Sequence, residues 1–290
     1  MNFVKKFICA AALALGTTGA AIASPVLNNW VFNPVGGGFA RGQVINEYLD
    51  FNGNAFIQLS STGGNTFSFK ETAVFNVLQA DSNGRYFPLN YPTGNISATF
   101  QASGNGVFGG EFAFSSGTIR IYRNPVAGQY ASTNGYYGAN LGEVIAEFNV
   151  LEGGGGMVDA SGSPTRNGQV SVFAQAAPGM IDAGYFFNSA GRDLSTESIL
   201  SFAFTNANTL GSPTTRLVSE VACQFAGFKG PGCSSGRYSN RAREYFFIGS
   251  NGQFKLAEVK EVPEPGSFAL FGIALLAAGA VSRKRKAAQN

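Results

Sequence analysis

Apolar and polar residues alternate along most of the chain between its two ends. In residues 66–78, apolar side chains such as Phe67, Phe69 and Phe75 occupy odd-numbered positions, whereas Lys70 and Asn76 occupy even-numbered ones. Successive side chains of a β-strand point to opposite faces, so this period of two predicts strands with one buried face. The same pattern predicts further strands at residues 43–51, 55–60, 96–102, 107–114, 118–122, 143–150, 169–174, 199–205, 215–223, 245–248 and 253–259.

Short clusters rich in Gly, Asn and Ser separate the expected strands. Asn251-Gly252 is the strongest hairpin signal, Asn52-Gly53-Asn54 reads as an Asx-rich turn, and Gly153-Gly154-Gly155-Gly156 reads as a flexible loop. Outside the two ends, no stretch longer than about ten residues has a helical period. Antiparallel strands that bury one face pack in pairs of sheets. We therefore predict an all-β, antiparallel β-sandwich-like single domain in residues 24–261.

The first 23 residues read as a secretory signal peptide with an apolar helix. Lys5 and Lys6 precede an apolar run, and Ala21 and Ala23 place small residues at both positions that signal peptidase reads. Cleavage after Ala23 would leave Ser24 as the new N-terminus. We expect signal peptidase to act on the chain during export.

The C-terminal end has three parts in a fixed order. Val262-Pro263-Glu264-Pro265 comes first, followed by an uncharged, mostly apolar run that ends at the basic cluster Arg283-Lys284-Arg285-Lys286. The run is near the short end of what spans a bilayer core of about 30 Å, which predicts a transmembrane helix. The basic cluster is expected to stay cytoplasmic, and residues 287–290 form a short tail.

Residues 262–286 resemble the PEP-CTERM sorting signal of Gram-negative bacteria in the order of motif, helix and basic cluster. The resemblance implies that exosortase recognises the chain in the inner membrane and cuts it near the Pro-Glu-Pro motif. It further implies delivery to the cell surface or the extracellular matrix. A simple C-terminal membrane anchor is the alternative.

The charge of the whole chain changes once these ends are set aside. The sequence has 20 Lys and Arg against 17 Asp and Glu, a formal charge of +3. Six of the basic residues lie in the two ends, and Glu264 is the one acidic residue beyond Val262, which leaves 14 basic and 16 acidic residues and a net charge of −2 between them. The basicity therefore belongs to the targeting segments, and we expect no nucleic-acid partner.

The chain contains no His, which narrows the chemistry that it can perform. Ser-His-Asp and Cys-His catalysis and His-ligated zinc all need that side chain. No nucleotide-binding loop, nucleophile elbow or zinc spacing is present either. We expect no enzyme activity, no metal and no cofactor.

Two cysteines remain after signal removal, Cys223 and Cys233. Export places them in an oxidising compartment, and a Gly-rich segment separates them. We predict a disulfide between them. The spacing differs from that of a redox-active Cys-x-x-Cys pair.

Four small groups of residues are candidates for a binding or catalytic site, each with a simpler structural explanation. Glu143 and Glu147 would lie about 13 Å apart on one strand, too far for a glycosidase pair. Asp50, Asn52 and Asn54 resemble half of a calcium loop, but the later Glu is missing. A third group, Arg237, Arg241 and Arg243, could bind an acidic polymer, although these side chains could simply be solvated at the surface. The fourth, Tyr136-Tyr137, could stack on sugar rings, although both rings could instead pack onto the edge of the core.

The body of the chain also resembles flocculation-associated PEP-CTERM proteins. The resemblance is carried by Ile45-Asn46-Glu47-Tyr48-Leu49-Asp50-Phe51, by residues 146–155 with their glycine turn, and by Phe202-Ala203-Phe204-Thr205-Asn206-Ala207-Asn208. It implies a surface or matrix protein that supports floc or biofilm formation together with secreted exopolysaccharide. The competing hypothesis is an exported carbohydrate-active enzyme that uses Asp and Glu residues brought together by folding.

Overall fold

The computed structural model describes residues 26–82, 85–165 and 168–259. The chain divides into two units, Met1–Glu258 and Val259–Asn290. The signal helix and the transmembrane helix expected from the sequence both lie outside the described residues. No helix in the described part of the chain is long and apolar enough to cross a membrane.

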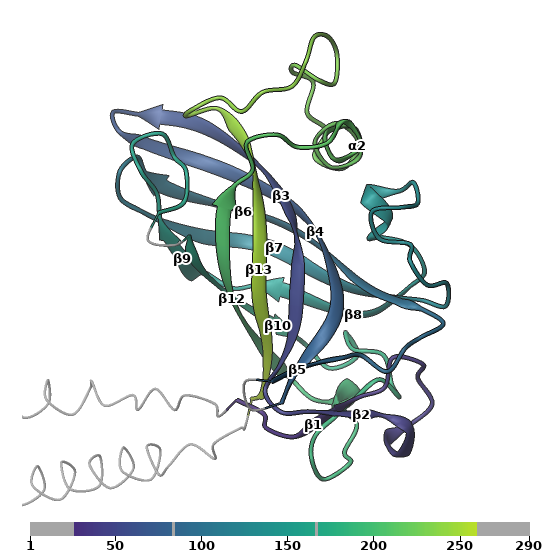
Figure 1. The fold of residues 1–290 in the computed structure, drawn as a ribbon. Helices are drawn as coiled ribbons and strands as arrows, with labels where there is room; N and C mark the ends of the chain where they lie inside the picture. The colour runs from purple at the N-terminus through teal and green to yellow at the C-terminus, as the bar shows by residue number, and fades with distance from the viewer. Residues whose placement is uncertain (1–25, 83–84, 166–167, 260–290) are drawn as a thin grey trace, which may run out of the picture. The chain divides into compact units, whose positions relative to one another are not determined.

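Strands dominate the first unit (Figure 1). They are β1 Trp30–Phe32, β2 Gln43–Ile45, β3 Tyr48–Gly63, β4 Thr66–Ser82, β5 Arg85–Pro88, β6 Asn95–Val107, β7 Glu111–Asn124, β8 Glu143–Val150, β9 Gly153–Met157, β10 Gln169–Ala176, β11 Phe186–Phe187, β12 Ile199–Thr209 and β13 Tyr245–Glu258. The helical segments are η1 Phe39–Arg41, η2 Tyr136–Gly138, η3 Leu194–Thr196, α2 Thr215–Leu217 and the π-helix η4 Val218–Phe225. The all-β, antiparallel class expected from the alternation is confirmed.

Ten of these strands form one antiparallel sheet that closes on itself. The order is β12-β13-β3-β4-β6-β7-β8-β10, and β10 then pairs with β12 from Gln169↔Asn206 to Ala176↔Ile199. Strand β9 pairs with both β7 and β10, and β5 extends β4. The faces that the sequence predicted to pack together as two sheets thus belong to a single sheet. A second sheet has three strands in the order β11-β1-β2.

The closed sheet buries the odd-numbered side chains of β3 and β4 in its interior. Leu49, Ala55, Phe67 and Val77 belong to this interior cluster, as do Phe246 and Phe254 on the even-numbered face of β13. The alternation predicted for residues 66–78 is confirmed. Aromatic rings contact one another throughout this core, so phenylalanine supplies much of its volume.

A second apolar cluster lies on the outward face of the same strands. Phe56, Val74 and Phe247 project outward there and pack against η4 through Val218 and Val221. The strand predicted at residues 215–223 is therefore wrong, because this segment is helical. Its apolar residues recur at helical spacing, and the Thr214 side chain caps the first turn by accepting a hydrogen bond from the Leu217 backbone N–H.

The predicted hairpin at Asn251-Gly252 is also wrong, because β13 runs through it without a turn. Gly252 pairs with Phe51 on β3 and with Thr205 on β12. The predicted turn at Gly53 and the predicted loop at residues 153–156 are likewise strands, β3 and β9. Pairing on both sides of each strand overrides local turn propensity in β3 and β13.

Candidate functional site

A row of asparagines crosses four neighbouring strands on the outward face of the closed sheet. Asn206 on β12 pairs with Asn251 on β13, Asn251 pairs with Asn52 on β3, and Asn52 pairs with Asn76 on β4. We call these four residues the asparagine row. The Asn251 side chain donates a hydrogen bond to Oδ1 of Asn52 across 2.7 Å. Neighbouring strands lie about 4.8 Å apart, so the row presents amides at regular intervals.

The asparagine row is open to solvent because the η4 helix covers only part of the outward face of the sheet. The η4 helix packs on Phe56, Val74 and Phe247, on the same outward face of the strands. Figure 1 shows α2 near one end of β3 and β13, away from the middle of those strands. Asn206 and Asn251 are exposed, whereas Asn52 and Asn76 are half-buried.

Aromatic side chains continue this face onto β10 and β12. Phe204 is 48% exposed, and Phe202 and Phe173 are half-buried beside each other with ring centroids 5.7 Å apart. Phe204 pairs with Ser171 on one side and with Gln253 on the other. Rings and amides therefore lie on adjacent rows of one surface.

The two rows meet at a surface hollow of about 480 Å³. We call this hollow the outer-face site; its outward polar and aromatic lining is Gln169, Ser171, Phe204, Asn206, Asn251 and Gln253. Each amide offers two donors and one acceptor, and an exposed ring offers an apolar face. Its volume is in the range of small-molecule sites. Sugar rings have hydroxyls around the edge and C–H groups on the faces, and this lining complements both.

Asp50 lies beside the outer-face site, paired with Gln253. Its carboxyl group is buried, and Oδ2 accepts a hydrogen bond from Asn52 across 2.6 Å. Burial raises the pKa of Asp50, and the Asn52 hydrogen bond partly offsets that rise. The residues around Gly53, which the sequence pattern assigns to an Asx-rich turn, are thus consecutive positions of one strand. Among the described residues, no three acidic or cysteine side chains gather closely enough to hold a metal ion.

The tyrosine pair proposed for sugar stacking packs against the protein instead. Tyr136 stacks on Phe225 at 4.1 Å, and Tyr137 meets Tyr130 edge to face at 5.4 Å. The backbone N–H of Tyr137 donates to the buried carboxylate of Glu220. Both rings therefore help to fix η4 to the sheet, as the core-edge alternative predicts.

The arginines before β13 have separate partners. Arg243 lies over the ring of Phe108 at 4.5 Å and donates to the Ala160 carbonyl, while Arg241 pairs with Glu244 at 3.5 Å. Arg237 is exposed. Arg241 and Arg243 thus make local contacts, which favours surface solvation over a site for an acidic polymer.

Glu143 and Glu147 each pair with an arginine on the adjacent strand β7. Glu147 lies 2.6 Å from Arg120, and Glu143 lies 3.4 Å from Arg123. The hydrogen bond that Arg120 donates to Glu147 raises the pKa of Arg120. A bulge in this pairing shifts the register, and Val144 is 39% exposed although strict alternation along residues 143–150 puts it on the same face as the buried Ala146 and Phe148.

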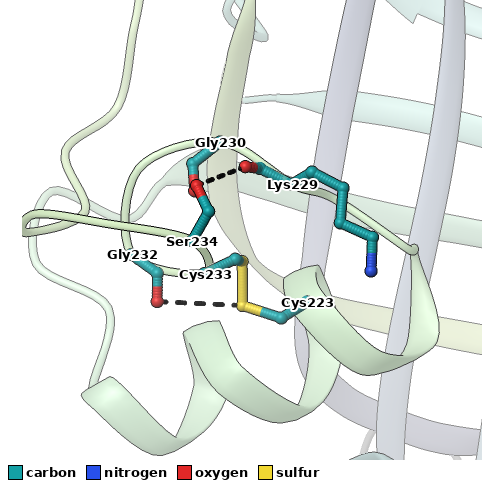
Figure 2. Close-up of a disulfide and its surroundings, with 6 residues drawn as sticks. All are labelled: Cys223, Lys229, Gly230, Gly232, Cys233 and Ser234. Carbon is teal, nitrogen blue, oxygen red and sulfur yellow. Dashed lines mark hydrogen bonds between the residues drawn. A yellow bond between two sulfur atoms is a disulfide. The ribbon is translucent and has the colours of Figure 1, made fainter.

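The predicted disulfide between Cys223 and Cys233 is confirmed. Their Cα atoms lie 5.4 Å apart. Figure 2 shows the bridge joining η4 to the loop that follows it, where Ser234 donates to the Lys229 carbonyl across 2.6 Å. The bridge therefore ties together the two ends of the segment that packs over Phe56 and Tyr245.

The sequence pattern missed the outer-face site because it assigned parts of it to turns. Asn52 and Asn54 on β3, like Asn206 and Asn208 on β12, alternate with positions that face the interior. Asparagine at every second position was the sequence signal that could have revealed the site. Which strands meet at the row depends on pairing between residues about 200 positions apart, which local patterns do not reveal.

The C-terminal end matches the family model of the PEP-CTERM protein-sorting motif over residues 261–286. No curated protein and no solved structure matches the chain. The sorting residues Val262, Pro263, Glu264, Pro265 and Arg283-Lys284-Arg285-Lys286, like Ala21 and Ala23, lie outside the described residues. The motif implies processing by exosortase, with a membrane-associated intermediate and delivery to the cell surface in Gram-negative bacteria. The chain therefore carries a PEP-CTERM protein-sorting motif at residues 261–286 and has an antiparallel, all-β body.

Proposed function

We propose that this protein is a non-catalytic component of the cell surface or extracellular matrix that retains exopolysaccharide and thereby supports floc or biofilm formation. The observation that carries the proposal is the outer-face site, where Phe204 and several amides line one open hollow. Sorting to the surface would bring that hollow into contact with secreted polymer.

The chemistry of the outer-face site favours a neutral, hydroxyl-rich ligand. Its side chains are amides, a hydroxyl and an aromatic ring. The adjacent carboxyl group of Asp50 is buried and hydrogen-bonded to Asn52, and Lys255 further along β13 is paired with Glu47 at 2.7 Å. The site therefore offers hydrogen bonds without a net charge. The β12 residues of the site lie within residues 202–208, a segment that resembles the flocculation-associated proteins. This resemblance supports the same role.

A deletion strain tests this role in cells. We expect the strain to remain dispersed while it still makes and secretes polymer, because the lost component retains polymer rather than synthesising it. Complementation with the native gene should restore flocs. Unchanged flocculation in the deletion strain would overturn the proposal.

The alternative, an exported carbohydrate-active enzyme, makes a different prediction. Incubating the exported chain with purified polymer should then shorten the polymer and release new ends. Loss of that turnover when one carboxylate is replaced would establish the enzyme. We expect polymer length to stay constant.

A further inference from the structure

The interior of the closed sheet contains a cavity of about 90 Å³ with one acidic side chain on its wall. Aromatic rings provide most of the lining, among them Phe51, Phe69, Phe75, Phe100 and Phe114. Glu71 on β4 projects into the same space because it lies on the odd-numbered, inward face between Phe69 and Ala73. Glu71 is half-buried, and partial removal of a carboxyl group from water among apolar groups is costly, which calls for an explanation of its position.

Glu71 has no polar partner within the described part of the chain. Its neighbours across the sheet are Ile57 on β3 and Ala102 on β6, both apolar. Among the described residues that line the cavity, Glu71 is the only titratable one; β7, β10, β12 and β13 contribute mainly apolar groups and hydroxyls, and Gln253 lies at an outward position next to the inward Phe254. Thr205 and Ser250, the lining hydroxyls, are hydrogen-bonded to each other.

These observations define a pocket with an apolar wall and a single polar anchor. A closed sheet of this size has an interior just wide enough to be filled by side chains or to hold one small ligand. Here the side chains leave space, and the space adjoins an unpartnered carboxyl group. A protonated carboxyl group both donates and accepts one hydrogen bond, as a hydroxyl group does.

We propose that this cavity binds a slender, uncharged apolar molecule that bears one hydroxyl group, with the hydroxyl hydrogen-bonded to Glu71 and the apolar part among the phenylalanine rings. An uncharged ligand suits the pocket because an ion pair would bury two charges among apolar groups. The site lies on the inward face of the same strands whose outward face carries the outer-face site, and it does not depend on the proposed function.

Burial raises the pKa of Glu71 to about 7, which predicts the direction of the pH dependence. An uncharged ligand that displaces water from the cavity favours the protonated carboxyl group further. It should therefore bind more tightly below the pKa than above it. An amine should show the opposite trend, because its ammonium group pairs with the carboxylate.

Hexanol and hexylamine are matched probes for this site. Titration of the exported chain, recovered from the cell surface, should show hexanol binding about tenfold more tightly near pH 5 than near pH 9. The Glu71→Gln variant should still bind hexanol through its amide but without that pH dependence. The Glu71→Leu variant should lose most of the affinity.

A cavity-filling variant keeps the test decisive if Glu71 variants fold poorly. Ala203 lines the cavity from β12, and Ala203→Phe should abolish hexanol binding while leaving the protein folded. Absence of hexanol binding to the native chain would overturn the proposal. Hexanol binding that strengthens rather than weakens from pH 5 to pH 9 would overturn the assignment to an uncharged ligand. Hexanol binding unchanged in both Glu71→Leu and Ala203→Phe would place the probe outside this cavity and would overturn the proposal.

Discussion

Asn251 on β13 donates a hydrogen bond of 2.7 Å to Asn52 on β3, although the two residues are 199 positions apart in the chain. Both asparagines lie next to a glycine, in a pattern typical of turns, yet both are inside continuous strands. Their contact joins the asparagine row across the middle of the sheet. It is also the point where local sequence propensity and tertiary pairing disagree most clearly.

Gly53 beside this contact should not tolerate a side chain. A Cβ atom at this position would collide with the carbonyl oxygen of Val74 and would lie 2.7 Å from the ring of Phe75. We expect Gly53→Ala to reduce the free energy of unfolding by about 2–3 kcal/mol, since strands β3 and β4 must move apart. Urea unfolding followed through Trp30, the single tryptophan, which is fully buried, measures the loss.

Gly211→Ala is the matched control, because a Cβ atom there has no neighbour within 4 Å. It should leave the stability nearly unchanged. Equal stability of the two variants would contradict the close approach of β3 and β4.

The fold class follows from sequence because alternation over residues 66–78 is strong and the buried positions occur where the pattern predicts them. Closure of the sheet does not follow, since it depends on β10 meeting β12. The helix at residues 215–225 was missed because valine, which favours strands, also fits a helix face that packs on Phe56 and Phe247. Of the site residues, Cys223 and Cys233 follow from export chemistry, whereas Glu71 among the phenylalanines gives no local signal.

Removing the disulfide should destabilise the protein moderately. The bridge closes a short loop, with a sequence separation of 10. Loop-closure entropy then gives about 2.5–3 kcal/mol for the double variant Cys223→Ser, Cys233→Ser. The difference in urea unfolding between the native chain and this variant measures the effect.

A reducing agent provides the control for the disulfide. It should lower the stability of the native chain towards that of the double variant and leave the variant unaffected. A native chain that keeps its stability after complete reduction would argue against a stabilising bridge.

Glu71 should make stability depend on pH in an unusual direction. Its folded-state pKa of about 7 lies above the ordinary value of 4.5, so the contribution of the protonated group is fully present below about pH 4.5. Stability is then lost as the pH rises through 7, by on the order of 3 kcal/mol in total. Unfolding free energies measured across this range test the prediction.

The Glu71→Gln variant isolates the effect of this group. Its curve of stability against pH should lack the fall that the native chain shows between pH 4.5 and 7. Parallel curves for the two proteins would mean that Glu71 titrates normally.

Glu264 should be needed for maturation. It lies inside the matched sorting motif, so Glu264→Ala is expected to leave an unprocessed precursor in the inner membrane. Cell fractionation followed by mass measurement of each fraction detects the precursor. Glu152→Ala, at an exposed position of the β body, is the control and should mature normally; normal maturation of Glu264→Ala would remove this residue from the sorting signal.

Binding of extracted exopolysaccharide to the exported chain is the most direct measurement of the proposed function. We predict that the native chain retains the polymer and that the double variant Phe204→Ala, Asn251→Ala weakens retention at least about tenfold, because each truncation removes a contact worth on the order of 1 kcal/mol. The double variant Val44→Ala, Val126→Ala, at exposed apolar positions outside the outer-face site, should bind as the native chain does. Equal retention by the native chain and by the Phe204, Asn251 variant, or no retention by either, would contradict the account.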